Sequence, residues 1–174
     1  MVFRDGTPSD AHAIAHLHAE SWCLAYRGIL SDHYLDQQVH ADRLTGWQKR
    51  LPTTADASSS KMLLILALDS GKLLGFSCAF SEHDSSYGSY LDNLHVAPGL
   101  TGRGIGSGLL RLTMERLRDS GSKSGLYLWV LERNTRARRF YQHHGATEIT
   151  PAVLIPMPDG QSLPEVRCFW PKLP

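Results

Sequence analysis

The residues with the clearest chemical content lie between positions 91 and 112, where the chain reads LDNLHVAPGLTGRGIGSGLLRL. An extended apolar segment ends at Pro98, glycines occupy every second position from 102 to 108, and leucines recur at helical spacing after Ile105. A strand that turns through glycines into a helix leaves several backbone N–H groups directed at one spot, and the helix dipole adds positive charge there. The stretch therefore predicts an anion site, and phosphate is the anion that such turns bind best.

Two well-known glycine loops do not match this stretch. The P-loop requires Lys and then Ser or Thr after its last glycine, where this chain has Ile105 and Gly106. The dinucleotide pattern G-x-G-x-x-G fails in both registers, because Ser107 or Leu109 stands where the third glycine belongs. A tight turn whose glycines only permit close packing is the alternative that binds no ligand.

The same stretch resembles the phosphate loop of the GNAT-superfamily N-acetyltransferases. In that family a Val-x-Pro strand end is followed by Gln/Arg-x-x-Gly-x-Gly/Ala at the start of a helix. Val96, Pro98, Gly104 and Gly106 fall on this pattern, whereas Thr101 replaces the family's Gln or Arg. The resemblance implies that the loop binds the pyrophosphate of acetyl-CoA, the acyl donor. The cofactor-binding residues that it implies here are Leu94, His95, Val96, Thr101, Gly102, Arg103, Gly104, Ile105, Gly106 and Ser107.

A second motif, LWVLERNTRARRFYQHHG at 128–145, resembles the strand–Asn–helix segment of the same family. On a helix that begins near Asn134, Ala137 and Tyr141 share one face. The Asn134 side chain offers both a donor and an acceptor, which suits the amides of a pantetheine arm. The resemblance implies that this arm enters a gap between two splayed central strands and is bound there like an added strand. It also implies cofactor contacts from Asn134, Ala137 and Arg138.

Acyl transfer to an amine requires a neutral amine and a proton for the departing thiolate. Tyr141 matches the family position of the acid, and a core tyrosine is the alternative. Asp92 stands four residues before the strand-end valine, where some relatives carry a general base, and a solvated or ion-paired carboxylate is the alternative. Many relatives instead carry Glu where this chain has Tyr90. Other side chains that stay open as the base are Glu82, His83 and His95.

Three further groups of residues have weaker chemical content. The histidines at 12, 16 and 18 lack the Glu of H-E-x-x-H and a third ligand, so we expect polar helix-face residues and no metal site. A basic cluster comprises Arg133, Arg136, Arg138 and Arg139. It has no aromatic stacking platform for RNA, and in the family such positions face the CoA phosphates. Aromatic residues that are candidates either for substrate contact or for core packing are Trp22, Tyr26 and Tyr34.

Composition is that of an ordinary globular protein. The chain has 174 residues, 42% of them hydrophobic, and a net charge of +1, so we expect one domain over 1–174 and neither nucleic-acid nor membrane partners. The longest apolar run, Met62–Leu68, is far shorter than the ~20 residues of a membrane helix. The N-terminus lacks the apolar core of a signal peptide, and the three cysteines lie far apart. We therefore expect a cytoplasmic protein, with a homodimer as the commonest oligomeric prior.

These motifs require strands and helices that alternate along the chain. The pattern predicts strands at 2–7, 62–68, 73–80, 87–96, 126–131, 146–155 and 166–170, with helices within 11–51, from 105 and at 134–144. Mixed elements of this kind predict a three-layer α/β domain. The order matches the GNAT fold, which implies a mixed sheet of about six to seven strands with a splay between its two central strands.

The function implied by the resemblance is transfer of an acetyl group from acetyl-CoA to a primary amine by direct attack. No cysteine has an evident His partner, which argues against an acyl-enzyme intermediate. A non-catalytic acyl-CoA-binding or sensing module on the same fold is the alternative, and a nucleotide-binding protein is a third. The acceptor, a small-molecule or peptide amine, stays open because a fold carries no substrate information.

Overall fold

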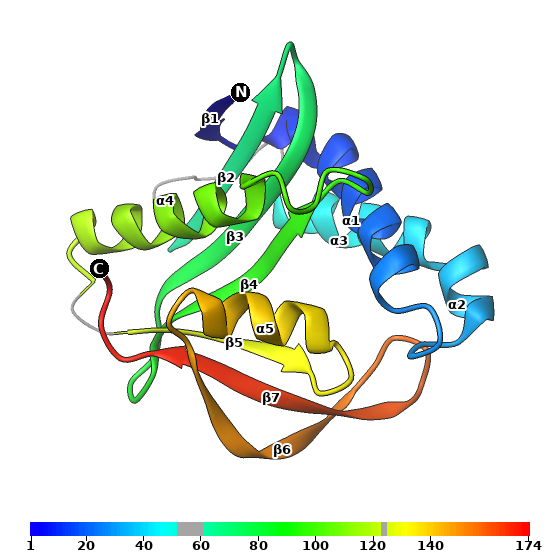
Figure 1. The fold of residues 1–174 in the computed structure, drawn as a ribbon. Helices are drawn as coiled ribbons and strands as arrows, with labels where there is room; N and C mark the ends of the chain where they lie inside the picture. Colours follow the sequence, from blue (N-terminus) through cyan, green and yellow to red (C-terminus); the bar gives the residue numbers. More distant parts are fainter. Residues whose placement is uncertain (52–60, 123–124) are drawn as a thin grey trace.

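The computed structural model describes residues 1–51, 61–122 and 125–174. Its elements, in chain order, are β1 (Val2–Asp5), a short 3₁₀ turn (Pro8–Asp10), α1 (Ala11–Ala25), α2 (Asp32–Gln37), α3 (Val39–Arg50), β2 (Met62–Asp69), β3 (Lys72–Asp84), β4 (Gly88–Val96), α4 (Ile105–Asp119), β5 (Leu126–Leu131), α5 (Thr135–His143), β6 (Thr147–Pro156) and β7 (Ser162–Trp170) (Figure 1). The predicted loop at 52–60 lies outside the described residues.

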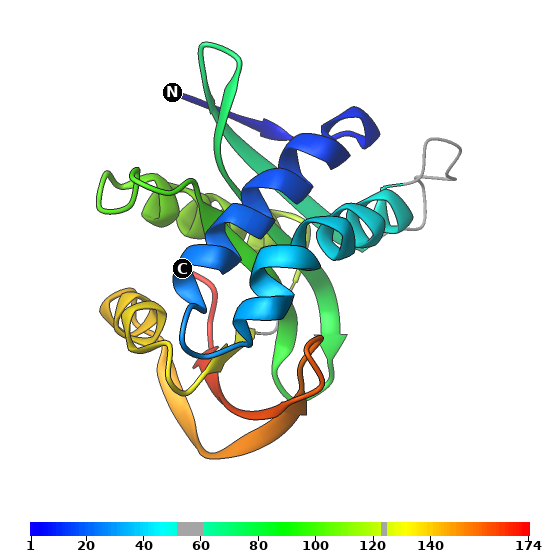
Figure 2. The ribbon, with the colours of Figure 1, turned by 90° about the vertical axis from the view of Figure 1, so that its right-hand side faces the viewer.

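Seven strands form one mixed sheet in the order β1-β2-β3-β4-β5-β7-β6, and β4 and β5 are its parallel neighbours. α1 and α3 pack on one face of the sheet through a cluster that includes Ile14, Trp47 and Phe76. α4 packs on the opposite face, where Ile105 and Leu109 bury against β2. Figure 2 shows α1, α2 and α3 together in front of the sheet, with α4 and α5 to one side. The predicted three-layer α/β architecture is confirmed.

The two central strands are paired only at their beginnings. β4 and β5 pair at Ser89↔Leu126 and Tyr90↔Tyr127, and Figure 1 shows the two strands diverging beyond these pairs. On its other edge β4 carries a bulge. The adjacent residues Cys78 and Ala79 of β3 pair with Asn93 and Leu91 of β4, so Asp92 is the extra residue in β4. A bulge increases local twist and re-aims the side chains around it. The predicted splay is therefore present, and it begins at this bulge.

The helix after β4 begins where the glycines predict it. Gly104 is the N-cap of α4 and has φ +78°, a left-handed conformation that costs a side-chain-bearing residue energy. The buried face of α4 carries the apolar residues of the predicted stripe, among them Leu110, Met114 and Leu117. Gly108 has a separate structural role, since a Cβ there would lie 2.8 Å from the Phe3 ring.

Two strand ends differ from the prediction by four residues. β3 continues to Asp84, past the predicted end at Phe80. β7 begins at Ser162, four residues before the predicted start at Val166. Pro164 lacks an amide hydrogen and reads as a strand breaker, yet it lies within the strand, and its carbonyl accepts a hydrogen bond from the Glu132 N–H at 2.8 Å. The extension matters for function, because it brings Glu165 onto the sheet. Among the described residues, no helix combines the length and apolarity needed to cross a membrane.

Candidate active site

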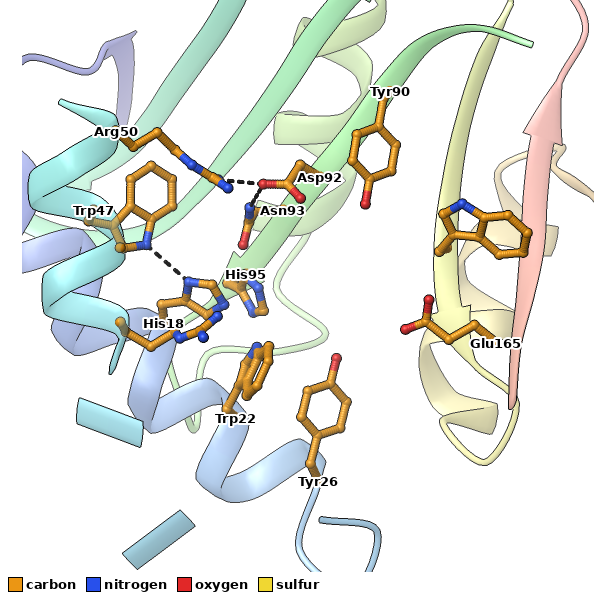
Figure 3. Close-up of a pocket in the computed structure, with 13 residues that line it drawn as sticks. His18, Trp22, Tyr26, Trp47, Arg50, Tyr90, Asp92, Asn93, His95 and Glu165 are labelled. Atoms are coloured by element: carbon orange, nitrogen blue, oxygen red, sulfur yellow. Dashed lines mark hydrogen bonds and ion pairs between the residues drawn. The ribbon is translucent and has the colours of Figure 1, made fainter. Parts of the chain in front are cut away.

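A cavity of about 330 Å³ lies beside the splayed strands, between α1 and α3 on one side and β4, β5 and β7 on the other (Figure 3). This volume is typical of a small-molecule site. Aromatic rings form much of its wall, and four charged side chains face it. The lining residues are His18, Trp22, Tyr26, Arg43, Gly46, Trp47, Arg50, Tyr90, Asp92, Asn93, His95, Trp129 and Glu165.

Of the aromatic residues proposed for substrate contact, Trp22 and Tyr26 line the cavity and Tyr34 does not. Tyr34 is 1% exposed, packs in a separate core cluster and donates to the Asp42 carboxylate at 2.9 Å. Periodicity alone could not separate these roles, because all three rings lie at spacings that suit either packing or binding.

Two neutral histidines line the cavity, His18 from α1 and His95 from β4. Trp47 Nε1 donates to Nδ1 of His18 at 3.0 Å, and the imidazoles of His18 and His95 lie 4.3 Å apart between ring centroids. Burial lowers the pKa of His95 to about 3 and the pKa of His18 well below its ordinary value. Neither imidazole is therefore protonated near neutral pH, and neither has the basicity to deprotonate an ammonium group. Expecting His18 on a polar helix face was wrong, since it is 4% exposed.

The other two histidines of that helix follow the prediction. His12 and His16 are exposed on α1. His16 lies near Glu20 and His40, and the possible ligand atoms of the three lie within 4.8 Å of one another. His40 Nε2 lies 3.2 Å from the Glu20 carboxylate, so this pair connects α3 to α1, the two helices that form one wall of the cavity.

Asp92 lies in the cavity wall, but its carboxylate is already engaged. The bulge directs it toward α3, where Oδ2 accepts from the Arg50 guanidinium and, at 2.5 Å, from Asn93 Nδ2 (Figure 3). A carboxylate held by two donors has a structural partner before any substrate arrives. The sequence leaves two roles open for Asp92, a general base and an ion-paired carboxylate. Its contacts match the ion-paired carboxylate.

Glu82 and His83, which the sequence also left open as the base, lie outside the cavity. Glu82 accepts from the Ser122 hydroxyl at 2.6 Å. His83 Nδ1 lies 2.7 Å from the Tyr127 hydroxyl. Neither residue lines the cavity, so neither is positioned to meet an acceptor bound there.

Glu165 is the carboxylate that sequence reasoning missed. Figure 3 shows its side chain extending from β7 into the cavity, toward the hydroxyls of Tyr26 and Tyr90. Its side chain forms no ion pair or hydrogen bond with another described residue, and burial raises its pKa above the ordinary value. The strand register pairs Glu165 with Leu131, which places it on the same sheet face as Trp129. The alternation of side chains through 163–169 could have indicated that the strand begins before Val166. Pro164 obscured this pattern, because proline usually interrupts a strand.

Tyr141 lies on α5 and is 8% exposed. It packs edge-to-face on Trp170 at 6.0 Å between centroids. Burial raises its pKa above the ordinary tyrosine value, and the nearby hydroxyls of Tyr26 and Tyr90 raise it further. Tyr141 does not line the cavity wall.

Asn134 caps α5, as predicted: its Oδ1 accepts from the Ala137 N–H at 3.2 Å. The Asn134 side chain also hydrogen-bonds Tyr26, which lowers the pKa of that phenol against the larger raising effect of burial. Asn134 thus connects the end of β5 to the end of α1 across the splay. Ala137 is half-buried against the core, one turn before Tyr141.

The loop between β4 and α4 presents free backbone donors. Positive φ values at Gly99, Gly102 and Gly104 turn the chain, and no N–H from 101 to 107 donates to another described residue. Uncapped amides at a helix start bind phosphate, so the loop fits the pyrophosphate of acetyl-CoA. The preceding residues Leu94 and Val96 lie on the splayed part of β4 and pack toward α4.

The charged side chains predicted near the cofactor differ in availability. Arg103 is exposed in the loop and has no ion-pair partner among the described residues. Arg138 forms a two-pronged ion pair with Glu148, at 2.7 Å for each contact, and donates to the Glu132 carbonyl. Arg138 is therefore committed to β6. Ser107 is partly committed as well, since its hydroxyl lies 2.9 Å from His144 Nε2.

A pair of glycine variants separates the conformational role of the loop from its binding role. We expect Gly104→Ala to lower stability by about 1 kcal/mol through left-handed strain and to weaken acetyl-CoA binding about tenfold through misaligned amides. Gly71 has φ +81°, lies in the β2–β3 turn and, like Gly104, has open space where an added methyl group would point. Gly71→Ala should cost the same stability and leave binding unchanged. Thermal denaturation and calorimetric titration measure the two effects, and equal affinities in both variants would contradict the assignment.

Comparison with known proteins agrees with this geometry. The uncharacterized N-acetyltransferase YuaI of Bacillus subtilis (strain 168) is 24% identical over 175 residues, covering 99% of this chain and 94% of that protein. The structure of PaiA N-acetyltransferase from Thermoplasma acidophilum in complex with coenzyme A has a TM-score of 0.68 at 18% identity and covers 97% of this chain and 98% of its own. The structure of yncA from Salmonella typhimurium with its cofactor acetyl-CoA has a TM-score of 0.69 at 18% identity and covers 98% and 93%.

The two structural neighbours show that the fold is shared over nearly the whole of both chains. The family model described as "Acetyltransferase (GNAT) family" matches residues 17–146, which extend from α1 through the glycine loop to the end of α5. This span exceeds half of the sequence, and the chain therefore belongs to the GNAT family of acetyltransferases.

Proposed function

We propose that this acetyltransferase moves the acetyl group of acetyl-CoA to a primary amine by direct attack. The observation that carries the proposal is the position of Glu165, an unpaired carboxylate in a cavity beside the splayed strands. Acetyl-CoA supplies an acetyl group activated as a thioester. The open amides of 101–107 would bind its pyrophosphate, and the splayed edge of β4 would bind its pantetheine arm.

Glu165 prepares the acceptor for attack. An alkylammonium with a pKa about 10 must lose a proton before its nitrogen is nucleophilic. A buried carboxylate with a raised pKa both attracts the ammonium and accepts its proton, directly or through water. We assign the base to Glu165 rather than Asp92, because Arg50 and Asn93 already hold the Asp92 carboxylate.

Tyr141 completes the proton balance. As the C–N bond forms and the C–S bond breaks, the Tyr141 hydroxyl donates a proton to the departing sulfur. The second proton that the attacking nitrogen loses on becoming an amide nitrogen restores the Tyr141 phenol, while Glu165 holds the first. Burial raises the pKa of Tyr141 and so keeps its hydroxyl protonated at neutral pH. The same apolar surroundings would raise the pKa of a thiol leaving group, which favours its protonation as it departs. Backbone N–H groups of β4 around Leu94–Val96 would stabilise the oxyanion.

A coupled thiol assay tests the proposal. Purified protein with acetyl-CoA and a panel of primary amines should release CoA at a rate that depends on the amine, with formation of the N-acetyl product by mass spectrometry. Acetyl-CoA without amine is the control for hydrolysis. Tight acetyl-CoA binding with no turnover on any amine or peptide would instead support the non-catalytic acyl-CoA-binding alternative.

A further inference from the structure

Four charged side chains face the cavity. Two of them form an ion pair with each other, and the other two, which carry opposite charges, remain unpaired in the part of the chain that the structure describes. Arg50 and Asp92 are bonded to each other. Arg43 on α3 and Glu165 on β7 are not, and neither forms an ion pair with another described residue. An unpaired charge in a partly buried cavity carries a desolvation cost that a ligand of opposite charge relieves. The free cavity thus offers one cationic and one anionic partner from opposite walls.

The cationic wall is held in place before any ligand binds. The Arg43 guanidinium lies over the Trp22 ring at 4.3 Å from its centroid. Its Nε is buried and bonds nothing in the described part of the chain. A planar, positioned guanidinium with free donors is the group that proteins use to bind carboxylates.

His18 adds a second donor to the same wall. Because the Trp47 indole donates to Nδ1 of His18, the neutral ring carries its proton on Nε2. That Nε2 is buried and has no partner among the described residues, although the side chain lines the cavity. Arg43 and His18 both pack on the Trp22 ring, with the guanidinium 4.3 Å and the imidazole 5.4 Å from the ring centroid, so the two donors belong to the same wall. Two unused donors at one place in a cavity call for an anionic acceptor.

We infer that the acetyl acceptor is an amino carboxylate, whose ammonium group meets Glu165 while its carboxylate binds Arg43 and the Nε2–H of His18. The inference rests on the proposed function and names its substrate class. Tyr26 lines the same cavity as Arg43 and Glu165. The aromatic walls from Trp22, Tyr26 and Trp129 suit an acceptor with an apolar body, such as an aromatic or thioether amino acid.

Matched ligand pairs that differ only in the carboxylate test this inference. The pairs are phenylalanine with 2-phenylethylamine and methionine with 3-(methylthio)propylamine, each assayed for CoA release and for binding by calorimetry. We expect the amino acid of each pair to have a kcat/KM at least about tenfold higher. Arg43→Met should lower kcat/KM for the amino acid by about 10- to 100-fold and leave the amine unchanged, so that the preference disappears. Arg43→Lys should retain part of the preference.

The control is Lys49→Met, which removes a positive charge from an exposed site on the same helix, outside the cavity, and should leave both members of each pair unaffected. Equal use of both members by the wild-type enzyme would overturn the inference and leave the acetyltransferase function standing. So would an equal loss for both members in Arg43→Met. If no amine is turned over, the proposed function fails, and the inference is then decided by calorimetry: preferential binding of the amino acids supports it, and equal or absent binding overturns it.

Discussion

Replacing Tyr141 with phenylalanine is expected to lower kcat by about 10²- to 10⁴-fold while acetyl-CoA binding stays nearly unchanged. The variant loses only the hydroxyl that we propose as the proton donor to the departing thiolate. The ring remains packed on Trp170, and no side-chain hydrogen bond in the described residues is broken. A loss in kcat without a change in affinity identifies an interaction made in the transition state alone.

Steady-state kinetics and calorimetric titration with acetyl-CoA measure the two quantities for Tyr141→Phe. Tyr87→Phe is a matched control, because Tyr87 packs on Phe169 and Arg167, away from the cavity lining. The control should keep full activity. Full activity in Tyr141→Phe as well would mean that the ring serves only the core and that the thiolate leaves without this acid.

Replacing Glu165 with glutamine is expected to lower kcat/KM at neutral pH by about 10²- to 10⁴-fold, because the variant keeps the shape of the side chain and loses its basicity. The pH profile provides a second readout. The carboxylate must be ionised to accept a proton, and burial raises its pKa above 4.5. Wild-type kcat/KM should therefore fall as pH decreases through that raised pKa, and this acid limb should be absent in the variant.

Stability separates a catalytic role of Glu165 from a structural one. A carboxyl whose folded pKa is raised binds protons more tightly in the folded state, so its ionisation destabilises the protein as pH rises through that range. Glu165→Gln removes this cost, and its melting temperature at neutral pH should equal or exceed that of the wild type. Asp92→Asn should instead lose stability, since Arg50 would lose its carboxylate partner.

The comparison of Glu165→Gln with Asp92→Asn decides which carboxylate is the base. If Asp92→Asn loses the acid limb of the pH profile and Glu165→Gln keeps it, the assignment to Glu165 is wrong. Kinetic profiles between about pH 5 and 9 and thermal denaturation at each pH are sufficient for both variants.

The glycine turn before α4 and the α5 motif could be predicted because their conformation is local. Three positive-φ glycines and the uncapped amides that follow them lie within ten residues of one another. Asn134 caps the helix that its position predicts, and Tyr141 lies on the inward face that helical spacing predicts. Turn, cap and helix geometry depend on neighbouring residues, so a short stretch of sequence is sufficient to specify them.

The cavity could not be predicted in the same way, because each wall comes from a different part of the chain. Arg43 and His18 come from separate helices, and Glu165 comes from the last strand. The partner of Asp92 is Arg50, which is 42 residues away, and nothing in either local sequence indicates that contact. Whether a carboxylate is free or paired depends on such long-range contacts, which arise only when helices pack on the sheet.

The sequence by itself determined the elements, the glycine turn that presents its amides and the family to which the chain belongs. Only the tertiary structure decided which charges remain unpaired, because the bulge at Asp92 turns that carboxylate toward Arg50 while β7 carries Glu165 into the cavity. Local conformation follows from dihedral preferences and capping, whereas the state of a charge follows from burial and from partners distant in the chain.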